Sequence, residues 1–335
     1  IVIELMGGTT PAKQYILEAL EAGKQVVTAN KDLLAEHGEE VMGMADKMHA
    51  DLQFEAAVAG AIPIIRPLKQ SMAGNNITEI IGIVNGTTNY ILTKMTESGM
   101  NYKDALAKAT ELGYAEADPT ADVEGYDACR KIAILSSLAF GQQVDFEDIY
   151  TEGITKITPA DMEYAKELGM TIKLLGTSRK LGEDTFTALV APFLVGQKSP
   201  LYSVNDVFNA VFVHGNMLGD AMFYGSGAGK LPTASAVVAD VVDEAKHLHR
   251  NIMTNWSSRP LKLMTMDEVE GRFFVRVKGT TVEQVEAVFD NVQIVNLKNL
   301  PGEFGFITEC MKQGTYEEKV HKLNGNVITM IRVKD

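Results

Sequence analysis

The densest group of ionisable side chains lies between Gly113 and Lys131. Five carboxylates fall within twelve residues of this stretch, at Glu116, Asp118, Asp122, Glu124 and Asp127. Asp127 and Lys131 are four positions apart, so on a helix the two side chains share one face. Such a pair is most often a solvated surface ion pair. Here, however, the apolar run Ile132–Phe140 follows at once and predicts a core helix, which would leave Lys131 partly buried.

A partly buried lysine could transfer protons. Burial and a second cation both weaken the hold of an amine on its proton, which suits an acid or base near neutral pH. Lys31 is the candidate second cation, because it follows the run Gln25–Thr28 at the carboxyl end of a predicted parallel strand, the edge at which such sheets bind ligands. A solvated lysine at the start of a helix is the alternative interpretation of Lys31.

Two further motifs could have either a structural or a functional role. The stretch Glu55–Pro63 closes a strand with small residues, so several carbonyl oxygens could face one point and suit a monovalent or calcium-like cation, although a packing turn also explains it. Asn85–Tyr90 reads as a turn with a helix N-cap, and cap chemistry alone accounts for it. No histidine pair has metal-ligand spacing, and no GxSxG elbow or P-loop lysine is present.

The elements that would position these residues begin with alternating strands and helices. We expect strands at Ile1–Met6, Gln25–Thr28 and Leu52–Val58, with helices at Ala12–Ala22 and Asp32–Ala50 between them. This order predicts a parallel sheet with right-handed crossovers. The glycine-rich GxGxxG turn of a doubly wound nucleotide site is absent, and Gly225–Gly229 has a different spacing. We therefore expect the second half of a Rossmann-like sheet in a chain that lacks its natural N-terminus.

The remaining chain divides into a middle and a C-terminal part. From Gly60 to Gly141 the sequence predicts helices at Pro63–Met72, Thr87–Ser98, Tyr102–Leu112 and Asp122–Phe140 and a strand at Ile77–Val84. Strands at Ile172–Arg179, Thr185–Val190 and Ala210–His214 and a helix at Ser235–His249 complete an α+β substrate and dimerisation domain. After a linker at Ser257–Pro260, the order βαββαβ predicts a ferredoxin-like domain.

Composition narrows the class of protein. The chain has 335 residues, which favours more than one domain, and a formal charge of −13 that would repel a nucleic acid. Its apolar runs are too short to span a bilayer. Cys129 and Cys310 lie far apart without CxxC partners, so neither a disulfide scaffold nor a zinc site is supported and a cytoplasmic location fits best.

Several strings together resemble homoserine dehydrogenase. They occur in family order over most of Ile1–Arg250: Gly7-Gly8-Thr9-Thr10-Pro11, Val27-Thr-Ala-Asn-Lys31, Glu55 to Ile65, Gly82 to Leu92, Leu112 to Lys131, and Gly225 to Asp240. The string from Leu112 to Lys131 is highly specific. The C-terminal unit resembles the ACT-type regulatory domain of many bacterial members. The implied domains are a partial NAD(P)-binding domain at 1–58, a substrate-binding and dimerisation domain at 59–255, and an ACT-like domain at 265–335.

The resemblance implies a reaction and roles for particular residues. The reaction is the reversible NAD- or NADP-dependent oxidation of L-homoserine to L-aspartate 4-semialdehyde, on the route to threonine and methionine. Lys131 would be the acid/base and Lys31 a second active-site lysine. The substrate would contact Glu116, Asp127, Asp122 and Tyr114. The cofactor would contact Gly8, Thr9, Lys31, Gly113, Gly227 and Gly229. A monovalent cation, Na⁺ or K⁺, would lie at Glu55, Val58, Gly60 and Ile62.

The resemblance also implies partners, and it leaves alternatives open. A homodimer or homotetramer is expected, with an amino-acid effector conceivable at the C-terminal domain. One alternative is a catalytically inactive ligand-binding or regulatory fragment of the same family. The other is a related semialdehyde dehydrogenase, which needs a nucleophilic cysteine in a loop, whereas Cys129 falls on a predicted helix beside Lys131.

Overall fold

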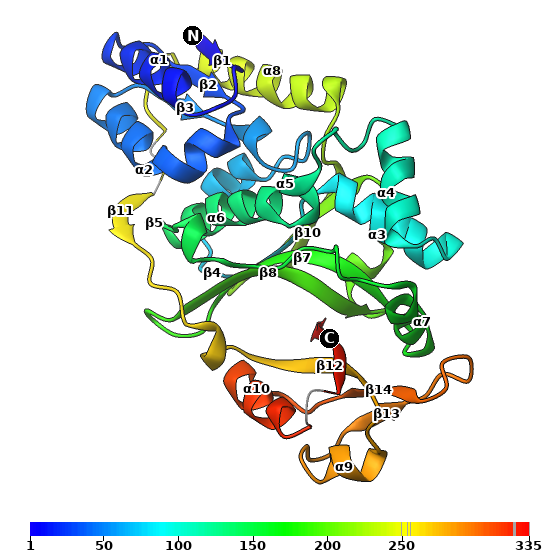
Figure 1. The fold of residues 1–335 in the computed structure, drawn as a ribbon. Helices are drawn as coiled ribbons and strands as arrows, with labels where there is room; N and C mark the ends of the chain where they lie inside the picture. The colour runs from blue at the N-terminus through cyan, green and yellow to red at the C-terminus, as the bar shows by residue number, and fades with distance from the viewer. Residues whose placement is uncertain (249, 253, 255, 324–325, 335) are drawn as a thin grey trace.

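The computed structural model describes residues 1–248, 250–252, 254, 256–323 and 326–334, arranged as stacked layers. In Figure 1 an N-terminal α/β unit in blue lies above a large sheet whose upper face carries helices, and a C-terminal unit in orange and red lies below. No helix within the described ranges is both long and apolar enough to cross a membrane.

The N-terminal unit is a small parallel sheet in the order β1-β2-β3, as expected from the strand–helix alternation. The strands are β1 (Val2–Glu4), β2 (Val26–Thr28) and β3 (Leu52–Gln53), and the helices are α1 (Thr10–Glu21) and α2 (Lys31–Met48). β2 is the central strand, and all three of its residues are β-branched and buried. The third strand is shorter than the expected Leu52–Val58, because the chain turns into the 3-10 helix η1 (Glu55–Ala57).

The large sheet has 11 strands among the described residues, nine of them in the order β10-β9-β4-β7-β8-β16-β12-β14-β13. Its first part consists of β10 (Gly219–Ser226), β9 (Phe208–Gly215), β4 (Ile77–Ile83), β7 (Met170–Lys180) and β8 (Phe186–Gly196). The short strands β6 (Tyr150–Thr151) and β15 (Met311–Lys312) pair with β8 and β12. The sheet is mixed, because β4, β7 and β9 are antiparallel neighbours while β16 runs parallel to β8. Neither β10 nor β6 was expected from the sequence.

Helices cover the upper face of this sheet and carry the candidate chemistry. They are α3 (Gly86–Ser98), α4 (Tyr102–Glu111), α5 (Thr120–Val123) and α6 (Tyr126–Phe140), and α7 (Pro159–Glu167) lies near one end of β7 (Figure 1). The expected single helix Asp122–Phe140 was wrong. It is divided into α5 and α6 because Gly125 adopts φ 85°, and a Cβ there would press on Thr151 and Val190. α7 was missed, and the expected helix Pro63–Met72 is mainly the π-helical turn η2 (Pro67–Ser71).

The C-terminal unit follows the expected βαββαβ order. It comprises β12 (Glu270–Lys278), α9 (Val282–Glu286), β13 (Gln293–Val295), β14 (Glu303–Ile307), α10 (Gln313–His321) and β16 (Val327–Lys334). It is not detached from the middle of the chain, because β16 pairs with β8 and continues the large sheet. The expected linker Ser257–Pro260 is strand β11, which pairs with β5 (Gln142–Gln143).

A buried ion group fastens the C-terminal unit to α7. Arg276 on β12 contacts Asp161 at 2.7 Å and Glu303 at 2.9 Å, and it donates to Thr158 Oγ1 at 3.0 Å. Thr158 and Asp161 also form the capping box of α7, so one carboxylate serves both the helix start and the arginine. Asp161 is fully buried.

We expect Arg276→Met to lower the free energy of unfolding by about 3 kcal/mol or more, because it leaves the Asp161 carboxylate buried without its cation. Urea unfolding followed by circular dichroism measures this. The control is Lys312→Met, which removes an ion pair with Glu268 that is half exposed and should cost far less stability. Equal losses in the two variants would contradict the assignment.

Candidate active site

The centre of the site is an ion pair on α6 between Lys131 and Asp127. Lys131 Nζ donates to Asp127 Oδ2 at 2.7 Å and to the carbonyl of Val84, at the end of β4, at 2.8 Å. Only 14% of the Lys131 side chain and 9% of the Asp127 side chain are exposed. The pair is therefore not the solvated surface pair that its spacing alone would favour.

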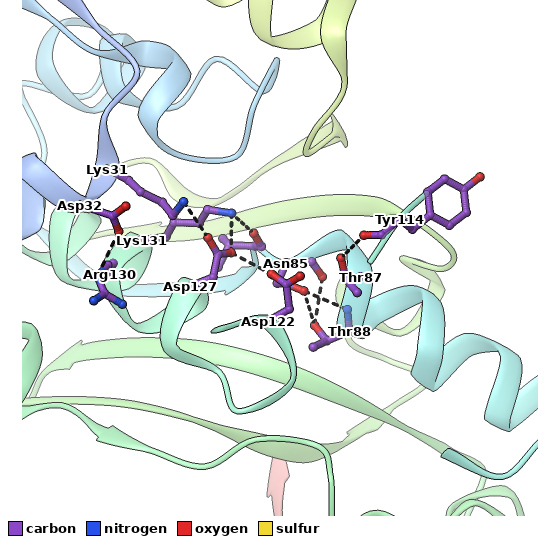
Figure 2. Close-up of polar contacts among 11 residues, drawn as sticks. Lys31, Asp32, Asn85, Thr87, Thr88, Tyr114, Asp122, Asp127, Arg130 and Lys131 are labelled. Atoms are coloured by element: carbon purple, nitrogen blue, oxygen red, sulfur yellow. Dashed lines mark hydrogen bonds and ion pairs between the residues drawn. The ribbon is translucent and has the colours of Figure 1, made fainter. Parts of the chain in front are cut away.

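Lys31, the first residue of α2 in the N-terminal unit, also contacts the Asp127 carboxylate. Its Nζ lies 3.4 Å from Asp127 Oδ1, so the two lysines contact opposite oxygens of one carboxyl group (Figure 2). Burial raises the pKa of Asp127, but the ammonium groups of Lys131 and Lys31 outweigh it, and the pKa of Asp127 is below its ordinary value. The expected meeting of the two lysines is present in the structure.

Asn85 is a further residue that contacts the Asp127 carboxylate. The sequence pattern indicates only a capping role for it. As expected, it is the N-cap of α3, with Oδ1 accepting from the backbone N–H of Thr88 at 2.9 Å. Its Nδ2 also donates to Asp122 at 2.7 Å and to Asp127 at 2.9 Å. Burial raises the pKa of Asp122, and the neighbouring Asp127 carboxylate adds to the increase. The only signal in the sequence was an asparagine directly after a strand that ends near the carboxylate cluster.

A cavity of about 210 Å³ opens beside this group. It is lined by Lys31, Asp32, Glu116, Asp118, Ala121, Asp122, Asp127 and Arg130. The carboxylates of Glu116, Asp122 and Asp127 thus line the same cavity as Lys31, and Arg130 is held by Asp32 at 3.1 Å. A cavity lined by carboxylates and a lysine amine suits a small zwitterion that carries an ammonium group and a reacting oxygen.

Tyr114 and Gly113 lie at the margin of the site. The carbonyl of Tyr114 accepts a hydrogen bond from Thr87 at 2.6 Å, and its ring packs against that of Tyr90. Figure 2 shows the Tyr114 ring pointing away from Lys131 and Asp127. The structure therefore does not bring the phenol of Tyr114 to the lysines. Gly113 follows α4 with φ 73° and nothing within 4 Å of a Cβ position.

A second cavity of about 340 Å³ shares Lys31 and Asp32 with the first. It lies at the carboxyl ends of β1 and β2 and is lined by Leu5, Gly7, Ala29, Asn30, Lys31, Asp32 and Thr233. Gly7 and Gly8 have φ 73° and 71°, and Asn30 Nδ2 holds the Gly8 carbonyl at 2.7 Å. An open glycine turn at this edge of a parallel sheet fits a nucleotide cofactor.

The other expected cofactor residues stand close to this cavity. Thr9 is the N-cap of α1, and its side chain makes no capping hydrogen bond. Gly229 is the N-cap of α8 (Lys230–Lys246), which carries the cavity residue Thr233. Gly227, in the preceding turn, packs against Gly60, because a Cβ on Gly60 would lie 2.4 Å from the Gly227 carbonyl oxygen.

The stretch Glu55–Ile62 forms a tight turn rather than a longer strand. Ala59 and Gly60 both have φ 58°, a region that a residue with a side chain rarely adopts, and Ala59 is fully buried. The Glu55 carboxylate accepts from the backbone N–H groups of Ile64 at 2.5 Å, Ile65 at 2.7 Å and Arg66 at 2.9 Å. Because the Glu55 carboxylate already accepts three backbone hydrogen bonds, the oxygen atoms that could bind a cation here are the backbone carbonyl oxygens of the turn. No group of three His, Cys, Asp or Glu in the described residues could hold a metal ion.

A buried ionic group lies behind this turn. Asp240 on α8 accepts from the Glu55 backbone N–H at 2.8 Å and from Arg66 at 2.7 Å. Burial raises the pKa of Asp240 to about 7 and that of Glu244 to about 8. Lys69 is the neighbouring cation, and burial lowers its pKa. These groups connect the two segments that cross between the N-terminal unit and the large sheet.

A glycine turn at the carboxyl edge of a parallel sheet, next to a buried lysine–carboxylate site, is typical of a nucleotide-dependent dehydrogenase. Two family profiles agree with this class. The profile described as "Homoserine dehydrogenase, NAD binding domain" matches residues 1–55, and the one described as "Homoserine dehydrogenase" matches residues 63–242. The chain belongs to the homoserine dehydrogenase family and is an NAD(P)-dependent oxidoreductase.

Individual relatives support the same conclusion. The chain is 55% identical to the homoserine dehydrogenase of Mycobacterium tuberculosis over 98% of its own length and 75% of the relative. It is 46% identical to that of Neisseria gonorrhoeae over 88% of its length and 71% of the relative. The solved homoserine dehydrogenase of Thiobacillus denitrificans is 36% identical, with a TM-score of 0.90 over 100% of this chain and 82% of that one. An archaeal homoserine dehydrogenase solved with NADPH is 31% identical, with a TM-score of 0.64 over 73% of this chain and 71% of that one.

The comparisons give no support to either alternative. Cys129 is buried, its Sγ donates to the Phe146 carbonyl at 3.3 Å, and burial raises the pKa of its thiol. A thiol in this state is a poor nucleophile, which argues against a cysteine-dependent semialdehyde dehydrogenase.

We expect Asp127→Asn to lower the free energy of unfolding at pH 7 by on the order of 1 kcal/mol, because the lysines lose their shared carboxylate. The folded-state pKa of Asp127 is below its ordinary value of 3.8, so the stabilisation is present above pH 4 and is lost as the pH falls through the folded-state pKa. Denaturation curves at several pH values should show the gap to wild type narrowing under acid conditions. A gap that does not change with pH would contradict this account.

Glu244→Gln should have the opposite pH dependence. The folded-state pKa of about 8 exceeds the ordinary 4.5, so the wild type loses stability as the pH rises between these values. We expect the variant to be more stable than wild type by roughly 1–4 kcal/mol at pH 9 and the difference to shrink towards pH 5. Thermal unfolding at both pH values measures this, and Glu318→Gln, at an exposed position, is the control.

Proposed function

We propose that Lys131 is the acid/base in the reversible oxidation of L-homoserine to L-aspartate 4-semialdehyde. The observation that carries this proposal is the position of its Nζ, which is partly buried and faces both a carboxylate and a backbone carbonyl. In alcohol oxidation the neutral amine takes the hydroxyl proton, and in aldehyde reduction the ammonium returns it. When bound, the nicotinamide of NAD or NADP supplies the hydride acceptor or donor.

Lys31 and Asp127 support the proton transfer. Asp127 holds both amines and thereby orients Lys131, while Lys31 places a second positive charge at the boundary of the two cavities. We assign Lys31 to the active site as the second lysine, in contact with cofactor and substrate.

The substrate occupies the cavity of about 210 Å³. Its ammonium group is held by Glu116, and its hydroxyl end lies near Asp127, with Asp122 as a further acceptor. Tyr114 contributes through its backbone position, since its ring packs on Tyr90.

The cofactor occupies the neighbouring cavity. Part of it lies on the turn of Gly8 and Thr9 at the start of α1, next to the cavity residue Gly7. Its nicotinamide end lies beside Lys31, with Gly113, Gly227 and Gly229 on the side towards the substrate. This placement brings the nicotinamide between the two cavities that share Lys31.

A monovalent cation, Na⁺ or K⁺, occupies the turn between Glu55 and Ile62. The carbonyl oxygens of Glu55, Val58, Gly60 and Ile62 are its ligands, because the Glu55 carboxylate already accepts three backbone N–H groups. The left-handed conformations of Ala59 and Gly60 turn the chain back on itself within this stretch, which helps carbonyls to converge.

The remaining proposals concern the domains, the oligomeric state and the cellular location. We propose an NAD(P)-binding domain at 1–58, a substrate-binding and dimerisation domain at 59–255, and an ACT-type domain at 265–335 that binds an amino-acid effector. The antiparallel order β16-β12-β14-β13 with two helices supports the last of these. The exposed apolar side chains of β10, Met222 and Tyr224, suit a homodimer or homotetramer formed through the large sheet. Free cysteines fit a cytoplasmic enzyme of threonine and methionine biosynthesis.

The test of this proposal is Lys131→Met in the full-length enzyme, assayed by nicotinamide absorbance with L-homoserine. We expect kcat to fall by roughly 10²- to 10⁴-fold with unchanged secondary structure, because no other amine contacts the Val84 carbonyl and Asp127 Oδ2 in the described structure. Lys131→Arg should be equally inactive, since a guanidinium keeps its proton. Lys108→Met, at an exposed ion pair, is the control and should retain activity. Turnover by Lys131→Met within threefold of wild type would overturn the assignment.

A further inference from the structure

A buried amide without partners lies at Asn209 on β9. The residue is 1% exposed, and in the part of the chain that is described neither Nδ2 nor Oδ1 has a hydrogen-bond partner. A primary amide can donate two hydrogen bonds and accept two, so leaving it unpaired in the interior costs stability. Asn89 on α3 shows the contrasting case, because its amide contacts the carbonyls of Val204 and Phe208 and the Nζ of Lys173. A cost that Asn209 carries and Asn89 does not points to a role other than folding.

Asn209 lies between two segments of the site. A Cβ built on Gly227 would fall 2.0 Å from Asn209 Nδ2, so the amide lies directly against the backbone of the turn that precedes α8. A Cβ built on Gly86 would be 3.6 Å from Asn209 Oδ1, and Gly86 directly follows Asn85, which holds Asp127. The amide therefore lies against the turn that the proposed placement puts beside the nicotinamide, and near the backbone that begins α3.

The register of the sheet brings Asn209 close to the catalytic lysine. Ala210 pairs with Ile83 of β4, so Asn209 stands next to the end of β4. Val84 is the residue at that end, and its carbonyl accepts the hydrogen bond from Lys131 Nζ. A group fixed by Asn209 is thus fixed relative to Lys131 through one pair of adjacent strands.

The turn Gly225–Gly229 is confined on both sides. Gly225 pairs with Asn209 in the β9–β10 ladder, and the carbonyl of Gly227 faces Gly60 on the other side. A side chain at Gly60 or Gly227 would collide with these neighbours. A small shift of the peptide groups on either side of Gly227 would consequently bring them into hydrogen-bonding geometry with Nδ2 and Oδ1 of Asn209.

We propose that Asn209 is a positioning residue: its unpaired amide forms hydrogen bonds with the backbone of Gly225–Gly229 when the cofactor binds, and so fixes this turn relative to Lys131. The inference rests on the proposed placement of the nicotinamide beside this turn. Without these hydrogen bonds the amide carries its desolvation cost uncompensated. Cofactor binding shifts the turn and pairs the amide, and the free energy recovered in this way favours the bound state.

The test is Asn209→Leu, which keeps the branching and the number of side-chain heavy atoms and removes both hydrogen-bonding groups. We expect an unchanged or higher melting temperature, because an unpaired buried amide has been replaced by an apolar group. We expect the KM for NAD(P)H to rise roughly 3- to 10-fold, the loss that corresponds to about one hydrogen bond, with the KM for L-homoserine unchanged. A purely structural role for Asn209 would not separate these quantities.

Asn89→Leu is the matched control, because it removes the same groups from a buried asparagine whose hydrogen bonds are made. We expect its melting temperature to fall while its KM for NAD(P)H changes less than that of Asn209→Leu. An Asn209→Leu enzyme with the wild-type KM for NAD(P)H overturns the proposal. A loss of cofactor affinity accompanied by the same fall in melting temperature as Asn89→Leu also overturns it. Asn209→Ala replaces the leucine variant if that variant does not fold.

Hydrogen exchange of the backbone amides at 226–228 gives a readout independent of activity. NADPH should slow this exchange in the wild type and slow it much less in Asn209→Leu. Equal protection in both proteins overturns the role of Asn209. A wild-type enzyme that shows no protection here but is protected elsewhere by NADPH overturns the cofactor placement itself, so the two failures are distinguishable.

Discussion

The carboxylate of Asp127 is the interaction on which the site depends. It accepts contacts from Lys131 on its own helix, from Lys31 at the start of α2 and from Asn85 at the start of α3. These three residues belong to three different helices, two on the large sheet and one in the N-terminal unit, and Figure 2 shows their polar ends directed at one point. A buried carboxylate is costly unless its lone pairs are used, and here two ammonium groups and an amide use them. The same contacts that compensate its burial bring the two cavities side by side.

The architecture around this point depends on where the chain crosses between layers. One crossing is the turn from Glu55 to Arg66, whose backbone N–H groups are collected by the Glu55 carboxylate. The other is the segment that leads from β10 into α8. The two meet where Gly60 contacts Gly227 and again where Asp240 binds the Glu55 backbone and Arg66. The position of the N-terminal unit over the cavity lined by Asp122 and Asp127 is thus set by two short segments packed against each other.

The large sheet provides a continuous support from the active site to the C-terminal unit. Val84, directly after β4, has the carbonyl that accepts the hydrogen bond from Lys131. From β4 the sheet continues through β7, β8 and β16 to β12. Arg276 closes the connection on the side of α7 through Asp161. The C-terminal unit is therefore connected through paired strands to the strand whose end contacts Lys131.

The sequence by itself determined the elements whose signals are local. The parallel strands, the helices α1 to α4 and the βαββαβ order follow from periodicity, caps and turns, and the i,i+4 spacing of Asp127 and Lys131 placed both on one helical face. The family strings then identified the chemistry. Tertiary structure alone decided the rest, because those features arise between residues far apart in the chain. The second role of Asn85, the Glu55 carboxylate bound by backbone amides, and the unpaired amide of Asn209 against Gly227 all depend on contacts with no local signature. The same is true of the pairing of β16 with β8, since an edge strand does not encode its partner in its own sequence.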